Sequence, residues 1–289
     1  MRRALCLSAA LLALACSPKT SSTTPPSEDA APTTKAPADN VPASTGPLTE
    51  AEFKALHELP EDAPADRKGE TLTLPGGAKA YLSLPPGPGP HPGIVVIHEW
   101  WGLNGHIERW ADRLASAGWA ALAVDLYGGA VATDRDGAMA AMKAVEPAKA
   151  IAVIGEGLRL LAEDPRIKAP VRATIGWCFG GGYSLQAAQA FPELDGAILY
   201  YGRFEADPAK LKPIHARLVG VFGDRDQGIP PAEVDKFEAA LHEAGVSAEI
   251  HHYDADHAFA NPSNPKYDEA NAGDAWGKVL VFLDALRKG

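Results

Sequence analysis

One cysteine in the sequence has the surroundings of a nucleophile. Residues 176–180 read Gly-Trp-Cys-Phe-Gly after a short apolar run, and we expect a helix to begin near residue 183. Gly-x-Cys-x-Gly at a strand-to-helix turn is the cysteine form of the nucleophile elbow. Cβ atoms at Gly176 and Gly180 would collide with backbone in so tight a turn. The turn would hold the Cys178 side chain at the positive end of the helix, which favours the reactive thiolate. The alternative is a buried, inert cysteine.

A histidine later in the chain is placed to act as a general base. His251 and His252 lie within an expected strand, residues 249–253, whereas His257 follows that strand. In parallel sheets, ligands bind beyond the carboxyl ends of the strands. We therefore predict that His257 is the base, the alternative being a histidine on a surface loop.

Two carboxylates follow the preceding expected strand and are candidates for the acid that orients the histidine. Asp224 lies beside Arg225 at a tight glycine turn, which suits a turn-capping role. Asp226 lies deeper in the loop, and we predict that it is the orienting acid. The chain order Cys, Asp, His is the order of an α/β-hydrolase triad.

The loop after the expected strand 94–97 carries the remaining candidates. In an α/β-hydrolase this loop supplies one backbone N–H of the oxyanion hole, and the residue after the nucleophile supplies the other. These donors would be the backbone N–H groups of Trp100 and Phe179. Glu99 is costly directly after a buried strand unless its charge is used. The alternative for Glu99 is a salt bridge with a cation such as Arg203.

Strands and helices alternate along the chain and would position these residues. The expected strands are 71–74, 78–82, 94–97, 120–124, 173–175, 197–200, 218–222 and 249–253, with the first two forming a hairpin. Apolar residues at helical spacing lie at 107–114, 234–241 and 276–283, and Gly118 and Gly245 end the first two helices. The pattern predicts one α/β domain with a mostly parallel sheet that is covered on both faces.

The N-terminal part has the composition of an export segment. Residues 1–15 combine Arg2 and Arg3 with a short apolar run, and the run ends at Cys16, which resembles a bacterial lipoprotein signal. We expect an exported protein that a lipid on Cys16 anchors to a membrane. The alternative is an ordinary cleaved signal and a soluble secreted protein.

Two further segments precede the domain. Residues 16–47 are mostly Ser, Thr, Pro and Ala, which predicts a disordered tether. In the lead-in, residues 48–67, the spacing of Thr49 and Glu52 is that of a capping box, which would open a short helix. We expect the α/β domain to span residues 68–289.

The composition limits the function classes. The chain has 289 residues and a formal net charge of −10, so it would repel nucleic acid and anionic lipid. We expect no nucleic-acid partner, contact with a membrane only through the lipid anchor, no cofactor, and a monomer.

Several segments together resemble the dienelactone hydrolase family. They are residues 98–104, 125–128, 176–181, 200–202, 223–226 and 257–259, which lie in the family's order within residues 68–289. The resemblance implies an α/β-hydrolase fold and a Cys178 thiolate that attacks the carbonyl of a small ester or lactone. It also implies that His257 and Asp226 assist, and that Glu99 contacts the cysteine and takes its proton when substrate enters.

The chain departs from this family at one substrate-binding position. Asn261 stands four residues after the histidine, where relatives that act on dienelactone carry an arginine for the substrate's carboxylate. Arg135, in an expected lid between residues 128 and 150, could compensate. We expect Arg135, Tyr127, Trp101 and Asn261 to contact the substrate.

Two other functions compete with an ester or lactone hydrolase. A metal-dependent hydrolase could use His251, His252, Asp254, Asp256 and His257. Neighbouring residues alternate faces along a strand, so few of these could converge on one ion. The other rival is a non-catalytic, surface-anchored binding protein on a hydrolase scaffold.

Overall fold

The computed structural model describes residues 48–57 and 67–289. The predicted signal, the lipidated Cys16, the tether and residues 58–66 of the lead-in lie outside the described residues. Across the two described ranges, no helix has the length and apolar character that crossing a membrane requires.

The first described helix begins at the predicted capping box. Helix α1 (Glu50–His57) follows Thr49 directly. The backbone N–H of Thr49 donates to Glu52 Oε2 over 2.8 Å, and the backbone N–H of Glu52 donates to Thr49 Oγ1 over 3.2 Å. This reciprocal pair satisfies two N–H groups that the helix itself leaves without partners.

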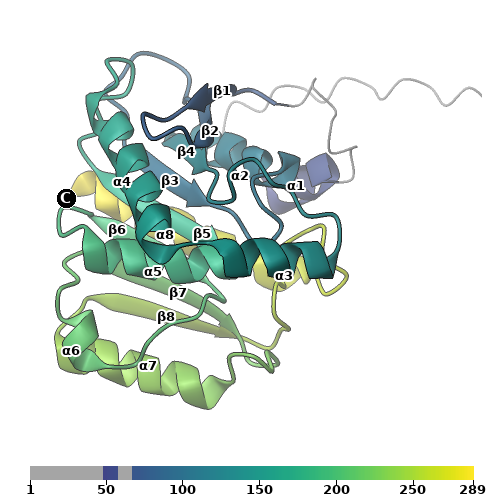
Figure 1. Ribbon diagram of the computed structural model, residues 1–289. Coiled ribbons are helices and arrows are strands. Elements are labelled where there is room, and N and C mark those ends of the chain that lie inside the picture. Colours follow the sequence, from purple (N-terminus) through teal and green to yellow (C-terminus); the bar gives the residue numbers. More distant parts are fainter. Residues whose placement is uncertain (1–47, 58–66) are drawn as a thin grey trace, which may run out of the picture. The chain divides into compact units, whose positions relative to one another are not determined.

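A sheet of eight strands forms the centre of the domain (Figure 1). The strands are β1 (Glu70–Thr73), β2 (Lys79–Ser83), β3 (Gly93–Ile97), β4 (Ala120–Val124), β5 (Arg172–Trp177), β6 (Gly196–Tyr200), β7 (Arg217–Gly223) and β8 (Ala248–Tyr253). Their spatial order is β1-β2-β4-β3-β5-β6-β7-β8. The pairs β1–β2 and β2–β4 are antiparallel, and the pairs from β4 through β8 are parallel. The predicted mostly parallel α/β sheet and its leading hairpin are confirmed.

Helices cover both faces of this sheet. The helices are α2 (Gly105–Ser116), α3 (Arg135–Ala144), α4 (Pro147–Glu163), α5 (Phe179–Ala190), α6 (Pro208–Leu211), α7 (Pro231–Ala244) and α8 (Glu269–Lys288). Alternate residues of one strand enter two separate cores: Ile94 and Val96 pack with α1, α2 and α8, whereas Val95 and Ile97 pack with α4, α5 and α7. In Figure 1, α4, α5 and α7 accordingly lie in front of the sheet. Burial on both faces explains why β3 is apolar throughout.

Two sequence-based boundaries differ from the structure. Helix α5 begins at Phe179, not near residue 183, because the glycines that follow the cysteine are themselves helical. The expected lid contains α3 and the start of α4, and α4 packs on the sheet through Ile154 and Leu158. Helix α3 buries only Ala138.

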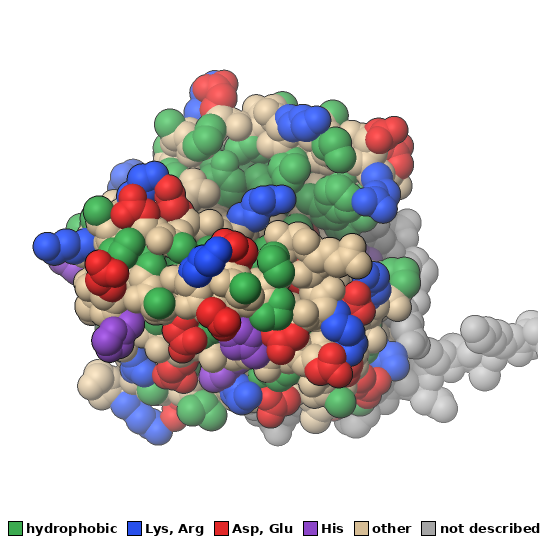
Figure 2. Space-filling view, turned by 90° about the horizontal axis from the view of Figure 1, so that it is seen from below, with side chains coloured by type: hydrophobic (Ala, Val, Ile, Leu, Met, Phe, Trp, Pro, Cys, Tyr) green, Lys and Arg blue, Asp and Glu red, His purple; other side chains and the backbone are tan. Residues whose placement is uncertain are grey.

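The surface seen in Figure 2 has no large area on which all charged side chains have the same sign. Acidic, basic and histidine side chains are interspersed there, and hydrophobic side chains gather in one area that Lys and Arg side chains border. The negative net charge is therefore spread over the surface on this face.

Candidate active site

The turn between β5 and α5 has the geometry of a nucleophile elbow. Cys178 adopts φ 52° and ψ −112°, a backbone conformation that residues with a side chain rarely adopt. A Cβ atom on Gly176 would lie 2.2 Å from the carbonyl oxygen of Gly180, and one on Gly180 would lie 2.3 Å from that of Ile97. Both positions therefore require glycine. The Cys178 side chain stays partly exposed at the start of α5.

The loops after β7 and β8 bring an acid and a histidine to this turn. His257 Nδ1 donates to Asp226 Oδ2 over 2.5 Å, and Cys178 lies close enough to His257 to raise the pKa of the imidazole. The other carboxylate oxygen of Asp226 accepts the backbone N–H groups of Gly228, at 2.8 Å, and Ile229, at 3.2 Å. The structure thus brings Cys178, His257 and Asp226 together, with a hydrogen bond between His257 and Asp226.

The second candidate acid has a different partner. Asp224 Oδ1 accepts a hydrogen bond from His252 Nδ1 over 2.8 Å, and its backbone N–H donates to the carbonyl oxygen of Tyr253. Asp224 therefore links the loop after β7 to β8. Of the two carboxylates, it is Asp226 that holds His257.

The charges and hydrogen bonds around His257 and Asp226 favour a protonated imidazole beside an ionised carboxylate. Burial alone would lower the pKa of His257, but its hydrogen bond to Asp226 and its interactions with the charges of Cys178 and Asp226 raise it to about 10. Burial also raises the pKa of Asp226, yet the hydrogen bond and charge of His257 and two backbone N–H groups bring it below its ordinary value. The imidazole of His257 is therefore protonated at neutral pH.

Backbone strain is concentrated around the same side chains. Besides Cys178, Tyr201 has φ 36° and Ala258 has φ 63°. The Tyr201 ring lies 5.1 Å from the His257 ring, centroid to centroid, and is fully buried. Strained non-glycine residues persist where the surroundings hold them, and they are frequent at functional sites. Tyr201 was missed as a site residue by sequence reasoning, although its place directly after β6 was a usable signal.

A buried histidine holds the loop that follows β3. His98 Nδ1 donates to the backbone oxygen of Glu99 over 2.6 Å, while its Nε2 accepts the backbone N–H of Leu126 over 3.1 Å. Burial lowers the pKa of His98 to about 4, so the ring is neutral and this tautomer is fixed. Its ring also packs against Tyr127 and Phe179, with centroids 4.6 Å and 5.6 Å away. His98 therefore ties together the loops after β3 and β4, a role that sequence reasoning missed.

The two predicted oxyanion donors lie on these fixed segments. Phe179 is the first residue of α5, where backbone N–H groups have no acceptor within the helix. Trp100 follows Glu99, and its ring packs 4.9 Å from that of Trp101. Backbone N–H groups on segments held in this way are suited to stabilising a developing negative charge.

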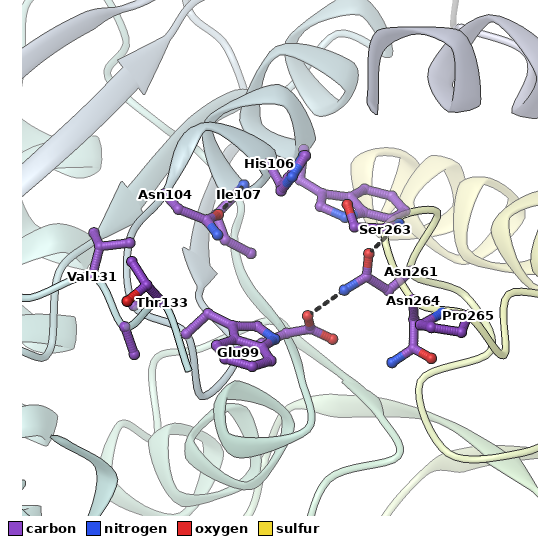
Figure 3. A pocket seen from close by; sticks show the side chains of 14 residues that line it. Glu99, Asn104, His106, Ile107, Val131, Thr133, Asn261, Ser263, Asn264 and Pro265 are labelled. Carbon is purple, nitrogen blue, oxygen red and sulfur yellow. Dashed lines mark hydrogen bonds between the residues drawn. The ribbon is translucent and has the colours of Figure 1, made fainter. Parts of the chain in front are cut away.

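Glu99 has a different partner from the ones expected. The carboxylate is only 7% exposed, and its Oε2 accepts a hydrogen bond from Asn261 Nδ2 over 2.5 Å (Figure 3). Glu99 forms no hydrogen bond with the Cys178 thiol, since its Oε1 has no hydrogen-bond partner among the described residues. Arg203, the alternative partner, is exposed, whereas Glu99 is buried. Burial raises the pKa of Glu99 to about 7, although attraction to His257 and the Asn261 hydrogen bond oppose the shift.

A cavity of about 400 Å³ opens beside Glu99 (Figure 3). Of the four predicted substrate-binding residues, Trp101 and Asn261 line it. Tyr127 packs on His98 instead. Arg135 is exposed at the start of α3, and its guanidinium carbon lies 5.7 Å from the centre of the Trp100 ring.

The acidic and histidine side chains around β8 do not converge on a metal site. Asp254 Oδ1 lies 2.5 Å from Arg225 Nη1, and Asp256 Oδ1 lies 2.7 Å from Lys266 Nζ. His252 pairs with Asp224. Within residues 48–57 and 67–289, no group of three or more potential ligands could hold a metal ion.

Comparisons with known proteins agree with this architecture. A model of the dienelactone hydrolase family matches residues 78–286. The chain belongs to this family. It is therefore a hydrolase of the dienelactone hydrolase type.

Individual relatives show the same similarity. A relative from Synechocystis sp., provisionally named a carboxymethylenebutenolidase, is 30% identical over 243 residues, which cover 77% of this chain and 99% of the relative. Protein usf from Aquifex pyrophilus is 30% identical over 215 residues, covering 71% of this chain and 92% of that protein. Among solved structures, a provisionally named dienelactone hydrolase from Klebsiella pneumoniae has a TM-score of 0.69 at 27% identity, covering 74% of this chain and 96% of that chain.

Proposed function

We propose that this dienelactone hydrolase family member hydrolyses small carboxylic esters or lactones, with Cys178 as the nucleophile. The observation that carries the proposal is the grouping of Cys178, His257 and Asp226, in which His257 is hydrogen-bonded to Asp226 and interacts with Cys178. A thiol beside an imidazole that a buried carboxylate orients is the arrangement required for nucleophilic acyl transfer.

The first half of the reaction forms a thioester. His257 holds the proton of the Cys178 thiol, and the sulfur attacks the carbonyl carbon of the substrate. The carbonyl oxygen becomes an oxyanion that accepts hydrogen bonds from the backbone N–H groups of Trp100 and Phe179. When the tetrahedral intermediate collapses, the C–O bond of the ester breaks and the leaving oxygen takes the proton from His257.

The second half releases the acid. His257, now neutral, removes a proton from a water molecule, and the resulting hydroxide attacks the thioester carbonyl. The C–S bond breaks, the carboxylic acid departs, and Cys178 and His257 return to their resting state. Asp226 stays ionised throughout and keeps the imidazole oriented.

Alkylation of Cys178 tests this proposal. A panel of small esters and lactones would be assayed before and after treatment of the protein with iodoacetamide. We expect modification of Cys178, identified by mass spectrometry, to proceed in step with the loss of hydrolysis. Full hydrolysis after complete alkylation would overturn the nucleophile assignment, and alkylation of a protein that hydrolyses nothing in the panel would favour a binding function.

We also propose that the protein is exported and anchored through a lipid on Cys16. The support is the N-terminal sequence: two arginines, a short apolar run and a cysteine at its end. Mass spectrometry of the mature N-terminus tests this. A lipidated cysteine is the expected result, whereas an unmodified N-terminus at another residue would leave a soluble secreted enzyme.

A further inference from the structure

The cavity beside Glu99 has an unusual charge for a site that could bind an organic acid. Among the described residues that line it, none is Lys or Arg, and the one carboxylate is Glu99. That carboxylate is buried and hydrogen-bonded to Asn261. Since its pKa is raised only to about 7, Glu99 carries its negative charge in mildly alkaline solution.

The cavity is connected to the proposed catalytic groups through Glu99, and neither Cys178 nor His257 lines it. Glu99 precedes Trp100, whose backbone N–H is a proposed oxyanion donor, and the charge of Glu99 interacts with that of His257. For the cavity to affect which substrates react, one substituent of a substrate bound at Cys178 must extend past Glu99 into it.

The remaining walls suit an uncharged group. Trp101, Trp110, Ile107 and Val131 provide apolar surface. The amide oxygens of two lining asparagines already accept backbone N–H groups, Asn104 from Ile107 and Asn264 from Lys266. Their NH₂ groups, together with the Thr133 hydroxyl, are left to donate to neutral acceptors such as carbonyl, ether or hydroxyl oxygens.

We propose that this cavity selects esters or lactones whose substituent beside Glu99 is uncharged, and that it rejects those carrying a carboxylate there. The inference rests on the proposed hydrolase function. Its physical reason is that a second negative charge would be placed near a buried carboxylate, with no lysine or arginine among the described lining residues, where the interaction is weakly screened.

Arg135, which is near the cavity residue Trp101 through the Trp100 ring, offers an alternative. It lies over the Trp100 ring and is exposed, so it could meet a substrate carboxylate from the solvent side. A cation in that position would be screened by water and would add little discrimination. The test therefore includes a variant of Arg135.

Two esters of equal length separate the possibilities. They are p-nitrophenyl hexanoate and the mono-p-nitrophenyl ester of adipic acid, each corrected for its rate of hydrolysis by hydroxide. At pH 8 we expect kcat/KM for the neutral ester to exceed that for the anionic ester by about tenfold or more. Arg135→Gln should leave this ratio within about twofold.

Thr133 allows a matched pair of variants, since it lines the cavity and is not one of the proposed catalytic residues. Thr133→Lys adds a cation, and Thr133→Met adds similar bulk without charge. We expect the ratio of kcat/KM for the anionic ester to kcat/KM for the neutral ester to be at least threefold higher in Thr133→Lys than in Thr133→Met.

The outcomes distinguish this inference from the function on which it rests. If the wild-type protein hydrolyses the anionic ester as fast as the neutral one, or if Arg135→Gln abolishes hydrolysis of the anionic ester alone, the hydrolase function stands and the selection is wrong. Equal behaviour of Thr133→Lys and Thr133→Met would likewise overturn it. Hydrolysis of neither ester would remove the function and the inference together.

Discussion

The two sides of the active site are built differently. On the nucleophile side, formed by Cys178, His257 and Asp226, each functional side chain has a partner and the backbone beside it is strained or closely packed. On the cavity side, formed by Glu99, Trp101 and Asn261, one hydrogen bond joins two of the residues, and an oxygen of Glu99 stays without a hydrogen-bond partner within the described chain.

We infer from this difference that the nucleophile side carries out the reaction, whereas the cavity side selects the substrate. The nucleophile side fixes distances between groups that exchange protons in the proposed reaction, so a small change there should affect turnover of every substrate. The cavity side presents charge and shape to only part of a substrate. Changes there should alter preference and stability more than the rate of the chemical step.

The largest effect is expected from Cys178→Ala. Removing the sulfur should lower kcat for a small activated ester by at least about 10³-fold, because no other group can form the thioester. The side chain is small, so the free energy of unfolding should change by less than about 1 kcal/mol. Steady-state kinetics and chemical denaturation of the purified variant check both statements. Retention of more than a trace of turnover would show that the nucleophile side is assigned wrongly.

Exchange of the two loop carboxylates should show the next largest effect. Asp226→Asn presents the wrong partner to His257 Nδ1 and should lower kcat/KM by about 10²-fold or more. Asp224→Asn is the matched control, because it changes the same kind of group in the same loop and should stay within about threefold. The reverse ranking, measured on one ester, would move the orienting acid to Asp224.

The nucleophile side was readable from the sequence, whereas the cavity side was only partly so. The nucleophile elbow is recognised from five consecutive residues, because its tight turn tolerates no Cβ at Gly176 or Gly180. A requirement of this kind can be seen within one segment of the sequence. The fold followed from strands that are apolar because both their faces are buried. The partner of Glu99 could not be read in this way, because Asn261 lies 162 residues later and meets it only in the folded chain.

A stability measurement should reveal the buried charge of the cavity side. The pKa of Glu99 is about 7 in the folded protein and 4.5 as the ordinary value, so the folded state binds the proton more tightly. This tighter proton binding stabilises the folded state fully below pH 4.5, and the stabilisation is lost as the pH rises through 7. The Glu99→Gln variant has no proton to lose at this position. Its free energy of unfolding, relative to that of wild type, should therefore rise by about 2 kcal/mol between pH 5 and pH 8.

Exposed Glu163 provides the control for that measurement. Chemical denaturation of wild type, Glu99→Gln and Glu163→Gln at both pH values gives the comparison. Glu163→Gln should follow wild type. If the free energy of unfolding of Glu99→Gln changes between the two pH values by the same amount as that of wild type, burial does not destabilise the ionised Glu99 carboxylate.

The smallest expected effect is that of Glu99→Gln on the rate of acylation. It distinguishes proton transfer from the cysteine to Glu99 from proton transfer to His257. If Glu99 took the thiol proton, as the family resemblance implies, Glu99→Gln would lower the rate of acylation strongly, because an amide cannot accept a proton. In the structure, Glu99 is hydrogen-bonded to Asn261, whereas Cys178 interacts with His257. We therefore expect the acylation rate of Glu99→Gln on a neutral ester at pH 7 to stay within about threefold of wild type, as measured by a pre-steady-state burst. His257→Gln is the contrast, since it removes the group that shares the proton with the thiol, and its burst should disappear. A loss of tenfold or more in the Glu99→Gln burst, with binding unchanged, would assign the proton transfer to Glu99 and unite the two sides of the site in one chemical step.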